Sequence, residues 1–199
     1  MFGLTAKIVQ RPPSAEKIIK QLLYGTAVGL TKTAKEAQAA VQGSARGKFT
    51  IRNRWLEQQT PVGIKIKPAM PTNPVAEVYT KAPFGPRQEF GGTKIPYKHW
   101  LAIPITGTAR PTKSSMIPKR NLPRSLQNAF VLTTKKGTTL LCVRKARGKN
   151  KGIVPMYVLV TRVQVKRTNW FHDPIEKVVR RRMMSIIDRE IGIALAKMR

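Results

Sequence analysis

The stretch "LLCVRKARGKNKGIVPMYVLVTRVQVKRT" (Leu140–Thr168) contains two apolar runs typical of β-strands. Lys and Arg residues separate and follow these runs, and the stretch contains neither Asp nor Glu. The first run is preceded by "AFVLT" (Ala129–Thr133) and a turn in which Gly137 can supply a positive φ, a pattern that predicts a β-hairpin. The second run contains Pro155, which predicts that its strand begins at a sheet edge or at a bend. The charge is therefore expected on folded strands.

The whole chain is strongly basic. It has 199 residues, of which 41% are hydrophobic, and 38 Lys and Arg against nine Asp and Glu give a formal net charge of +29. No acidic residue occurs between Glu89 and Asp173. Self-repulsion on this scale destabilises a compact monomer unless opposite charges lie close by. We therefore expect an anionic partner or an acidic protein neighbour.

The N-terminal part predicts a long helix. Ser14 is the expected N-cap, and Gly43 and Gly47 are expected to end the helix. Gly25 and Gly29 are either tolerated irregularities or the place where another element crosses closely. The apolar stripe of this helix consists of Ile18, Ile19, Leu22, Leu23, Leu30, Ala34, Ala37 and Val41.

The C-terminal part predicts a second helix. Asp173 as N-cap, Pro174 in the first turn and Glu176 three residues after the cap match a capping box, and apolar residues continue at helical spacing nearly to Arg199. One face of this helix is basic.

Between the helices, the pattern predicts short strands. Val62–Ala69 and Val75–Lys81 read as a first hairpin, residues 82–98 as a loop, and His99–Ile105 as a strand at a sheet edge or one that bends near Pro104. The segment Thr106–Ser125 is basic and contains three prolines, so it is expected to bury little. It is either an exposed arm or an inserted loop that becomes ordered against a neighbouring subunit.

The predicted fold is therefore α+β, as a single domain over residues 1–199. A small antiparallel β-sheet is expected to pack against the long N-terminal and C-terminal helices, with residues 106–125 as an extended Pro-rich basic arm or inserted loop.

Catalytic and metal-binding patterns are absent from the sequence. Cys142 is the only cysteine and is expected to be a buried apolar residue, and His99 and His172 stand beside no nucleophile motif. The sequence therefore predicts no enzyme, no metal and no cofactor, and it contains no apolar run long enough to cross a membrane.

Two groups of basic residues are the candidate contacts. The first is expected to face DNA or an acidic partner, because a basic surface binds phosphates without reading sequence and the charge alone does not distinguish them. This group consists of Lys145, Arg147, Lys149, Lys151, Arg162, Lys166 and Arg167.

The second group is expected to contact neighbouring subunits. The segment "KFTIRNRWL" (Lys48–Leu56) interleaves aromatic and basic residues, and an Arg side chain can stack on an indole. The alternative is that Phe49 and Trp55 are core anchors between helix and sheet. The residues of this group are Arg52, Arg54, Trp55, Arg180, Arg181 and Arg182.

Several stretches resemble minor tail proteins of tailed bacteriophages. They are "KHWLAIPITGTARPTK" (Lys98–Lys113), "GIVPMYVLVTRVQVKRTNWF" (Gly152–Phe171), and "FTIRNRW" followed by "GIKIKPA". The order of elements is similar to that of tail-completion proteins related to minor tail protein Z and to head–tail joining families. Trp100–Pro104 and Ile153–Arg167 carry the most specific likeness.

The resemblance implies a structural virion protein. Copies would form a homo-oligomeric ring at the head-proximal end of the tail, joining the tail tube or tail terminator to the neck or connector around the DNA path. It implies contact with acidic tube subunits, nonspecific contact with genomic DNA, and a clasp formed by residues 106–125. The protein would be found in the virion tail or neck, and in the host cytoplasm during assembly. The alternative, from composition alone, is a ribosomal or other RNA-binding protein with basic extensions.

Overall fold

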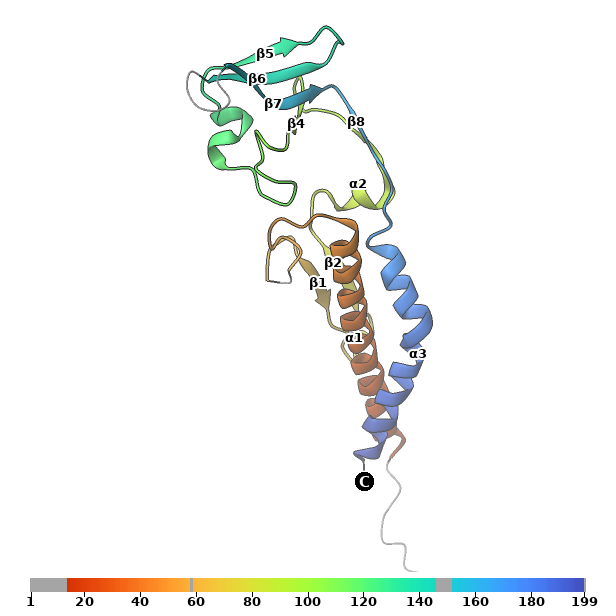
Figure 1. Cartoon of the computed structure of the whole chain (residues 1–199). Helices are drawn as coiled ribbons and strands as arrows, with labels where there is room; N and C mark the ends of the chain where they lie inside the picture. Colours follow the sequence, from red (N-terminus) through yellow and green to blue (C-terminus); the bar gives the residue numbers. More distant parts are fainter. Residues whose placement is uncertain (1–13, 58, 146–151, 199) are drawn as a thin grey trace, which may run out of the picture. The chain divides into compact units, whose positions relative to one another are not determined.

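The computed structural model describes residues 14–57, 59–145 and 152–198, whose contacts form two compact units. The described parts of Met1–Ser44, Val62–Lys81 and Phe171–Arg199 make up unit 1, and Ala45–Pro61 and Ala82–Trp170 make up unit 2. A long N-terminal helix, a C-terminal helix and small antiparallel sheets confirm the predicted α+β class (Figure 1). The single domain over residues 1–199 stays a prediction.

Unit 1 is built on two helices, α1 (Ala15–Lys48) and α3 (His172–Ala196), which lie side by side (Figure 1). They approach closely at Gly25 and Gly29: a Cβ atom built on either glycine would lie 2.7 Å from the Cα of Ile191 or Ile187, respectively. Of the two readings of these glycines, the close crossing is therefore the one observed. The four-residue spacing places both glycines on the same face of α1.

The expected ends of the helices need correction. α1 continues past Gly43 and ends at Lys48, one residue after Gly47, and Ala45 in its last turn is fully buried. α3 begins at His172, preceded by Phe171 without a capping side chain, so the capping box at Asp173 is wrong. Asp173 lies instead in the first turn, where the positive end of the helix dipole stabilises its negative charge.

The apolar stripe predicted for α1 is buried only in its second half. Ala34, Ala37 and Val41 are buried, whereas Ile19 and Leu23 are exposed. The reason is that α1 faces α3 with small residues at the two glycine positions, and the large residues of the first turns fall outside this contact.

The hairpin predicted for Val62–Lys81 is confirmed. It consists of β1 (Ile64–Lys67) and β2 (Glu77–Thr80), paired antiparallel. Side chains of α1 hold the hairpin at two points. The Gln38 amide donates to the carbonyl of Ile64 at 2.6 Å, and the Thr31 hydroxyl accepts from the N–H of Ala69 at 3.1 Å.

Unit 2 contains a four-stranded antiparallel sheet in the order β4-β7-β6-β5. The strands are β4 (Leu101–Pro104), β5 (Ala129–Thr133), β6 (Thr139–Lys145) and β7 (Gly152–Val160). The β5–β6 hairpin and the edge position of β4 are confirmed. The turn of this hairpin contains Gly137 with a φ of 78°, as expected.

Pro155 lies at a β-bulge inside β7 and not at the start of its strand, which begins at Gly152. Leu141 pairs with Tyr157, but its neighbour Cys142 pairs with Pro155, so β7 carries one extra residue at this point. The bulge lies before the part of β7 that pairs with β4, Tyr157–Val160. A proline is tolerated there because its missing N–H interrupts no ladder with β4.

The loop predicted for residues 82–98 is wrong. This segment forms α2 (Gly85–Phe90) and β3 (Gly92–Lys94), and β3 pairs antiparallel with β8 (Val163–Val165). The composition of residues 92–94 gives no strand pattern. The segment becomes a strand through its hydrogen bonds to β8, about 70 residues later in the sequence. Thr168 fixes α2 next to this ladder: its N–H and its hydroxyl donate to the carbonyl of Gln88 at 2.9 and 2.6 Å.

Residues 106–125 pack against the sheet of their own unit. Ala109 is fully buried among Val154, Met156, Tyr157 and Leu159, and Ile117 packs at the border of this cluster. The segment contains two short 3₁₀ helices, η1 (Lys119–Asn121) and η2 (Pro123–Ser125). The Tyr157 hydroxyl donates to the carbonyl of Asn121 at 2.6 Å. Contact of this segment with a neighbouring subunit stays a prediction.

Candidate basic interface

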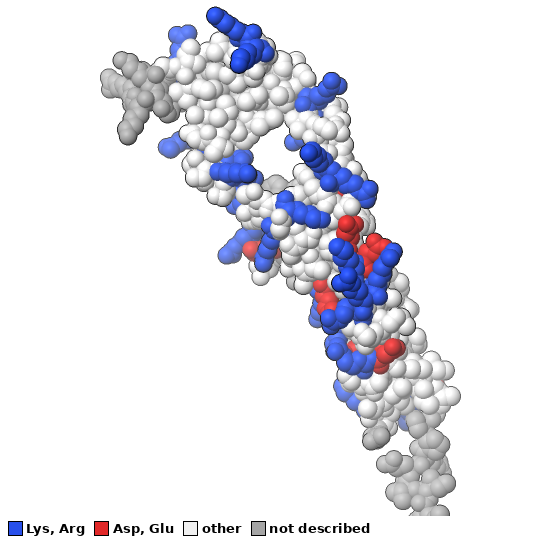
Figure 2. Space-filling model, turned by 45° about the vertical axis from the view of Figure 1, so that its right-hand side comes forward, with Lys and Arg blue, Asp and Glu red and all other residues white. Residues whose placement is uncertain are grey.

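The charge of the chain is distributed unevenly between the units. Unit 2 contains 22 of the 38 Lys and Arg residues but only two acidic residues, Glu57 and Glu89. Glu89 is buried, and the Glu57 carboxylate lies 3.7 Å from Nε of Arg54. Figure 2 shows one face of the molecule. In the upper part of that view, over the four-stranded sheet, the coloured side chains are blue Lys and Arg. The charged residues of unit 2 are therefore almost all cationic.

One basic side chain lies on the sheet itself. The guanidinium of Arg144, in β6, lies 5.4 Å from the ring centre of Phe130 in the neighbouring strand β5. Attraction between a cation and the face of an aromatic ring holds the side chain in place without neutralising it. Arg144 can therefore bind an anion at low entropic cost, although the sequence analysis did not include it among the candidate contacts.

Of the predicted DNA- or acid-facing residues, three are described with their side chains. Arg162 lies in the turn between β7 and β8, and Lys166 and Arg167 follow β8; all three are exposed. Arg167 donates through Nε to the side-chain oxygen of Asn169. These residues adjoin the β3–β8 ladder, so the structure places them on a different sheet from Arg144.

Lys145 is the last residue of β6. Arg147, Lys149 and Lys151 lie outside the described residues.

The segment with Arg52, Arg54 and Trp55 is used partly within its own unit. The guanidinium of Arg52 donates twice to the carbonyl of Lys113, at 3.1 and 2.9 Å, and so ties this segment to residues 106–125. Arg54 is exposed beside Glu57. Trp55 stacks on Phe84, with ring centres 6.3 Å apart, and remains 50% exposed.

Both readings of the aromatic residues in this segment find support. Phe49 packs edge-on against Trp170 at 5.7 Å, which makes it a core anchor. Trp55 lies at the border of the same cluster and leaves half of its surface for a partner. Its role as a subunit contact stays a prediction.

The three arginines of α3 differ in their surroundings. Arg180 pairs with Glu176 one turn earlier at 2.5 Å, and Arg182 reaches across to Glu36 of α1 at 3.3 Å. Arg181 is exposed between them. Because both pairs are exposed, they contribute little to stability and can be exchanged for contacts to another subunit.

A more buried ion pair, which the sequence analysis missed, joins the two helices. Glu190 of α3 is 5% exposed and accepts from Lys32 of α1 at 2.6 Å and from Arg189 at 3.2 Å. These hydrogen bonds, with that of Lys32 the strongest influence, hold the pKa of Glu190 below its ordinary value of 4.5. No local pattern could pair residues 32 and 190, because their contact depends on the helix crossing.

Acid should weaken unit 1 through this carboxylate. Because the pKa of Glu190 is lowered in the folded state, its contribution to stability is present above pH 4.5 and is lost as the pH falls through the folded value. We expect the denaturant midpoint of the full chain to fall less between neutral and acidic pH in Glu190→Gln than in the wild type. The matched control is Glu16→Gln, which removes an exposed carboxylate paired with Lys20 and should keep the wild-type pH dependence. Identical pH profiles for all three proteins would contradict this role of Glu190.

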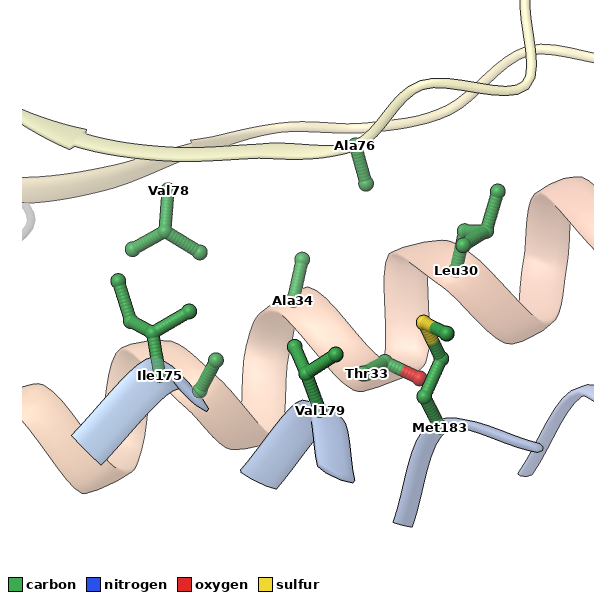
Figure 3. A pocket seen from close by; sticks show the side chains of 9 residues that line it. Leu30, Thr33, Ala34, Ala76, Val78, Ile175, Val179 and Met183 are labelled. Carbon is green, nitrogen blue, oxygen red and sulfur yellow. The ribbon is translucent and has the colours of Figure 1, made fainter. Parts of the chain in front are cut away.

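Unit 1 also contains an apolar cavity of about 150 Å³ (Figure 3). It lies between α1, α3 and the β1–β2 hairpin, and Thr33 is its only polar lining residue. The Thr33 hydroxyl donates to the carbonyl of Gly29 at 2.9 Å and is therefore occupied. The lining residues are Leu30, Thr33, Ala34, Ala37, Ala76, Val78, Ile175, Val179 and Met183. A cavity without convergent polar groups cannot orient a substrate, so we interpret it as a packing gap.

The described residues show neither a metal cluster nor an activated cysteine. No group of three or more His, Cys, Asp or Glu side chains in the described ranges could hold a metal ion. Cys142 is buried, and burial raises the pKa of its thiol, which keeps it protonated and a poor nucleophile. None of the helices in the described part of the chain has the length and hydropathy needed to span a bilayer.

Comparison with known proteins adds no relative. No family model matches the chain, and no curated protein and no solved structure is significantly similar to it.

Proposed function

We propose that this chain is a structural protein of a bacteriophage tail or neck. Copies of it would form a homo-oligomeric ring at the head-proximal end of the tail tube and join the tail to the connector around the DNA path. Its partners would be the tail tube or tail terminator and the neck proteins, and its role would be assembly rather than catalysis. It would act in the virion, after assembly in the host cytoplasm.

The observation that carries this proposal is the cationic surface of unit 2. With 22 basic residues against Glu57 and the buried Glu89, this unit has almost no internal compensation for its charge. A folded unit of this kind is stabilised when anions or acidic proteins lie against it. Positions beside acidic tube subunits and the DNA path meet this requirement.

The residues that carry the resemblance to tail proteins support the proposal in a second way. The stretches Lys98–Lys113 and Gly152–Phe171 are far apart in sequence, yet they contribute the paired strands β4 and β7, with Leu101 opposite Val160. The two most specific stretches of the resemblance therefore meet in one part of the four-stranded sheet.

The experiment that tests the proposal is the oligomeric state of nuclease-treated protein. Light scattering after size exclusion should give a single closed oligomer, and electron microscopy should show rings. Binding to double-stranded DNA should fall steeply with added salt, because each neutralised phosphate releases counterions. A monomer that copurifies with RNA and binds RNA in preference to DNA would favour the RNA-binding alternative. A monomer that ignores both polynucleotides and acidic proteins at low ionic strength would refute both.

A further inference from the structure

The four-stranded sheet of unit 2 has two apolar faces. An antiparallel sheet with one face in water usually alternates apolar and polar residues, whereas a strand covered on both faces is apolar at consecutive positions. β7 is of the second kind: every residue from Ile153 to Val160 is apolar or aromatic. Its inner face, with Val154, Tyr157 and Leu159, is covered by Ala109 and its neighbours. The sequence of β7 therefore requires a cover on its other face as well.

The strand register defines this other face. Leu132 pairs with Leu140, Leu140 with Val158, and Val158 with Ile103, so these four residues form one apolar row across all four strands. Together with Phe130 and Ile153 we call them the outer face. Leu132, Ile103 and Ile153 are 38%, 42% and 53% exposed, respectively. Leu140, Val158 and Phe130 are half-buried, and Cys142, which lies on the same face opposite Phe130, is buried. An apolar patch this continuous is unusual on a surface that faces only water.

Contact between side chains confirms the assignment of the faces. Arg144 is two residues from Cys142, which is opposite Phe130, and the Arg144 guanidinium lies over the Phe130 ring. Both side chains therefore project from the outer face. Along the strands, a fixed cation thus lies on one side of the Leu132–Leu140 pair, and the β5–β6 turn with Lys135 and Lys136 lies on the other side.

We propose that the outer face is the docking site for an amphipathic helix of an acidic partner protein. The apolar stripe of the helix would cover the row from Leu132 to Ile103, and its flanking carboxylates would meet Arg144, Lys135 and Lys136. A helix laid on a sheet is a standard way to bury such a face. This inference names the class of partner for the assembly role proposed above.

The chemistry of the outer face favours this occupant over two others. Single-stranded nucleic acid is held by several stacked aromatic side chains, but the row is aliphatic and its one aromatic neighbour, Phe130, already has Arg144 over its ring. A second copy of unit 2 would bring the same positive charge to the contact. An acidic helix supplies both the apolar stripe and the opposite charge.

The test uses the full chain and a fluorescent synthetic peptide of Leu and Glu with Leu at three- and four-residue steps. A peptide of the same composition in scrambled order separates patterned binding from attraction by charge alone. Anisotropy should show tighter binding of the patterned peptide. Leu132→Glu, and Leu132→Ser without added charge, should each weaken this binding about tenfold or more. The matched control is Val131→Glu, because Val131 is the neighbouring residue of the same edge strand, is 56% exposed and points to the other face.

Each of the following results would overturn the proposal. The scrambled peptide could bind as tightly as the patterned one, or the Leu132 variants could bind the patterned peptide like the wild type. An oligothymidylate could lose its binding in Leu132→Ser while the peptide does not, which would assign the face to nucleic acid. An oligomer could dissociate in Leu132→Ser while no peptide binds, which would assign it to a second copy. If the protein formed rings but did not bind the peptide, this inference would be wrong and the proposed function would be unaffected.

Discussion

Trp170→Ala is expected to lower the free energy of unfolding of unit 2 by about 3–5 kcal/mol, the usual cost of truncating a buried aromatic residue. Trp170 is 1% exposed and packs against Phe49 and Phe84, with ring centres 5.7 and 6.3 Å away. Its indole N–H faces the carbonyl of Gly85 at 3.4 Å. The residue therefore joins three segments that are far apart in sequence, and its loss leaves a cavity that they cannot fill together.

The measurement is urea unfolding of the full chain, with hydrogen exchange to locate the effect. Amides of α2 and of residues 49–57 should lose protection, while those of the β1–β2 hairpin keep it. Trp100→Ala is the matched control, because Trp100 is the same residue type in the same unit but is 47% exposed. Its effect should be less than half as large. Equal losses for both variants would show that the cluster around Trp170 is not the core of this part of unit 2.

This cluster illustrates what the sequence could not supply. The interpretation of "KFTIRNRWL" left open whether Phe49 and Trp55 were core anchors or contacts, because their partners Phe84 and Trp170 lie far away in sequence. The Lys48 ammonium reaches the carbonyls of Thr168 and Asn169 at 2.5 and 2.8 Å, a link that no local pattern encodes. α2 and β3 were missed for the same reason: their stability comes from Thr168 and from β8 and not from their own residues.

Elements with a local signature were predicted well. Both terminal helices, the β1–β2 hairpin and the β5–β6 hairpin follow from apolar spacing and from turn residues such as Gly137, which act within a few positions. Helix ends were less accurate, since Gly43 does not stop α1 and Asp173 does not cap α3. Tertiary contacts decide where these helices begin and end, and a cap preference of about 1 kcal/mol does not outweigh them.

The candidate site was predicted as a charge and not as a geometry. The sequence indicates the acid-free region between Glu89 and Asp173, and the structure confines most of it to unit 2. It could not show that Arg144 lies over Phe130, or that one side of the sheet carries an aliphatic row, because both depend on strand register. A one-residue change of register would place Leu132 and Leu140 on the opposite face.

Gly29→Ala should destabilise unit 1, even though alanine is the better helix former by about 1 kcal/mol. The new Cβ would lie 2.7 Å from the Cα and 2.9 Å from Cγ1 of Ile187. The Cα belongs to the backbone of α3 and cannot rotate away, so the helices must separate. Overpacking of this kind costs about 1–3 kcal/mol, which exceeds the gain in helix propensity. Gly25→Ala should act in the same way against Ile191.

The control for this prediction is in the same helix. Gly43→Ala places a Cβ where no atom lies within 4 Å, so only the helix propensity changes and α1 should become more stable by about 0.5–1 kcal/mol. The two substitutions are chemically identical and should move the unfolding midpoint in opposite directions. Separation of the helices by Gly29→Ala should also pull Lys32 away from Glu190 and reduce the acid sensitivity that this pair causes. If Gly29→Ala stabilised the chain as Gly43→Ala does, α1 and α3 would not be in backbone contact, and the crossing that organises unit 1 would have to lie elsewhere.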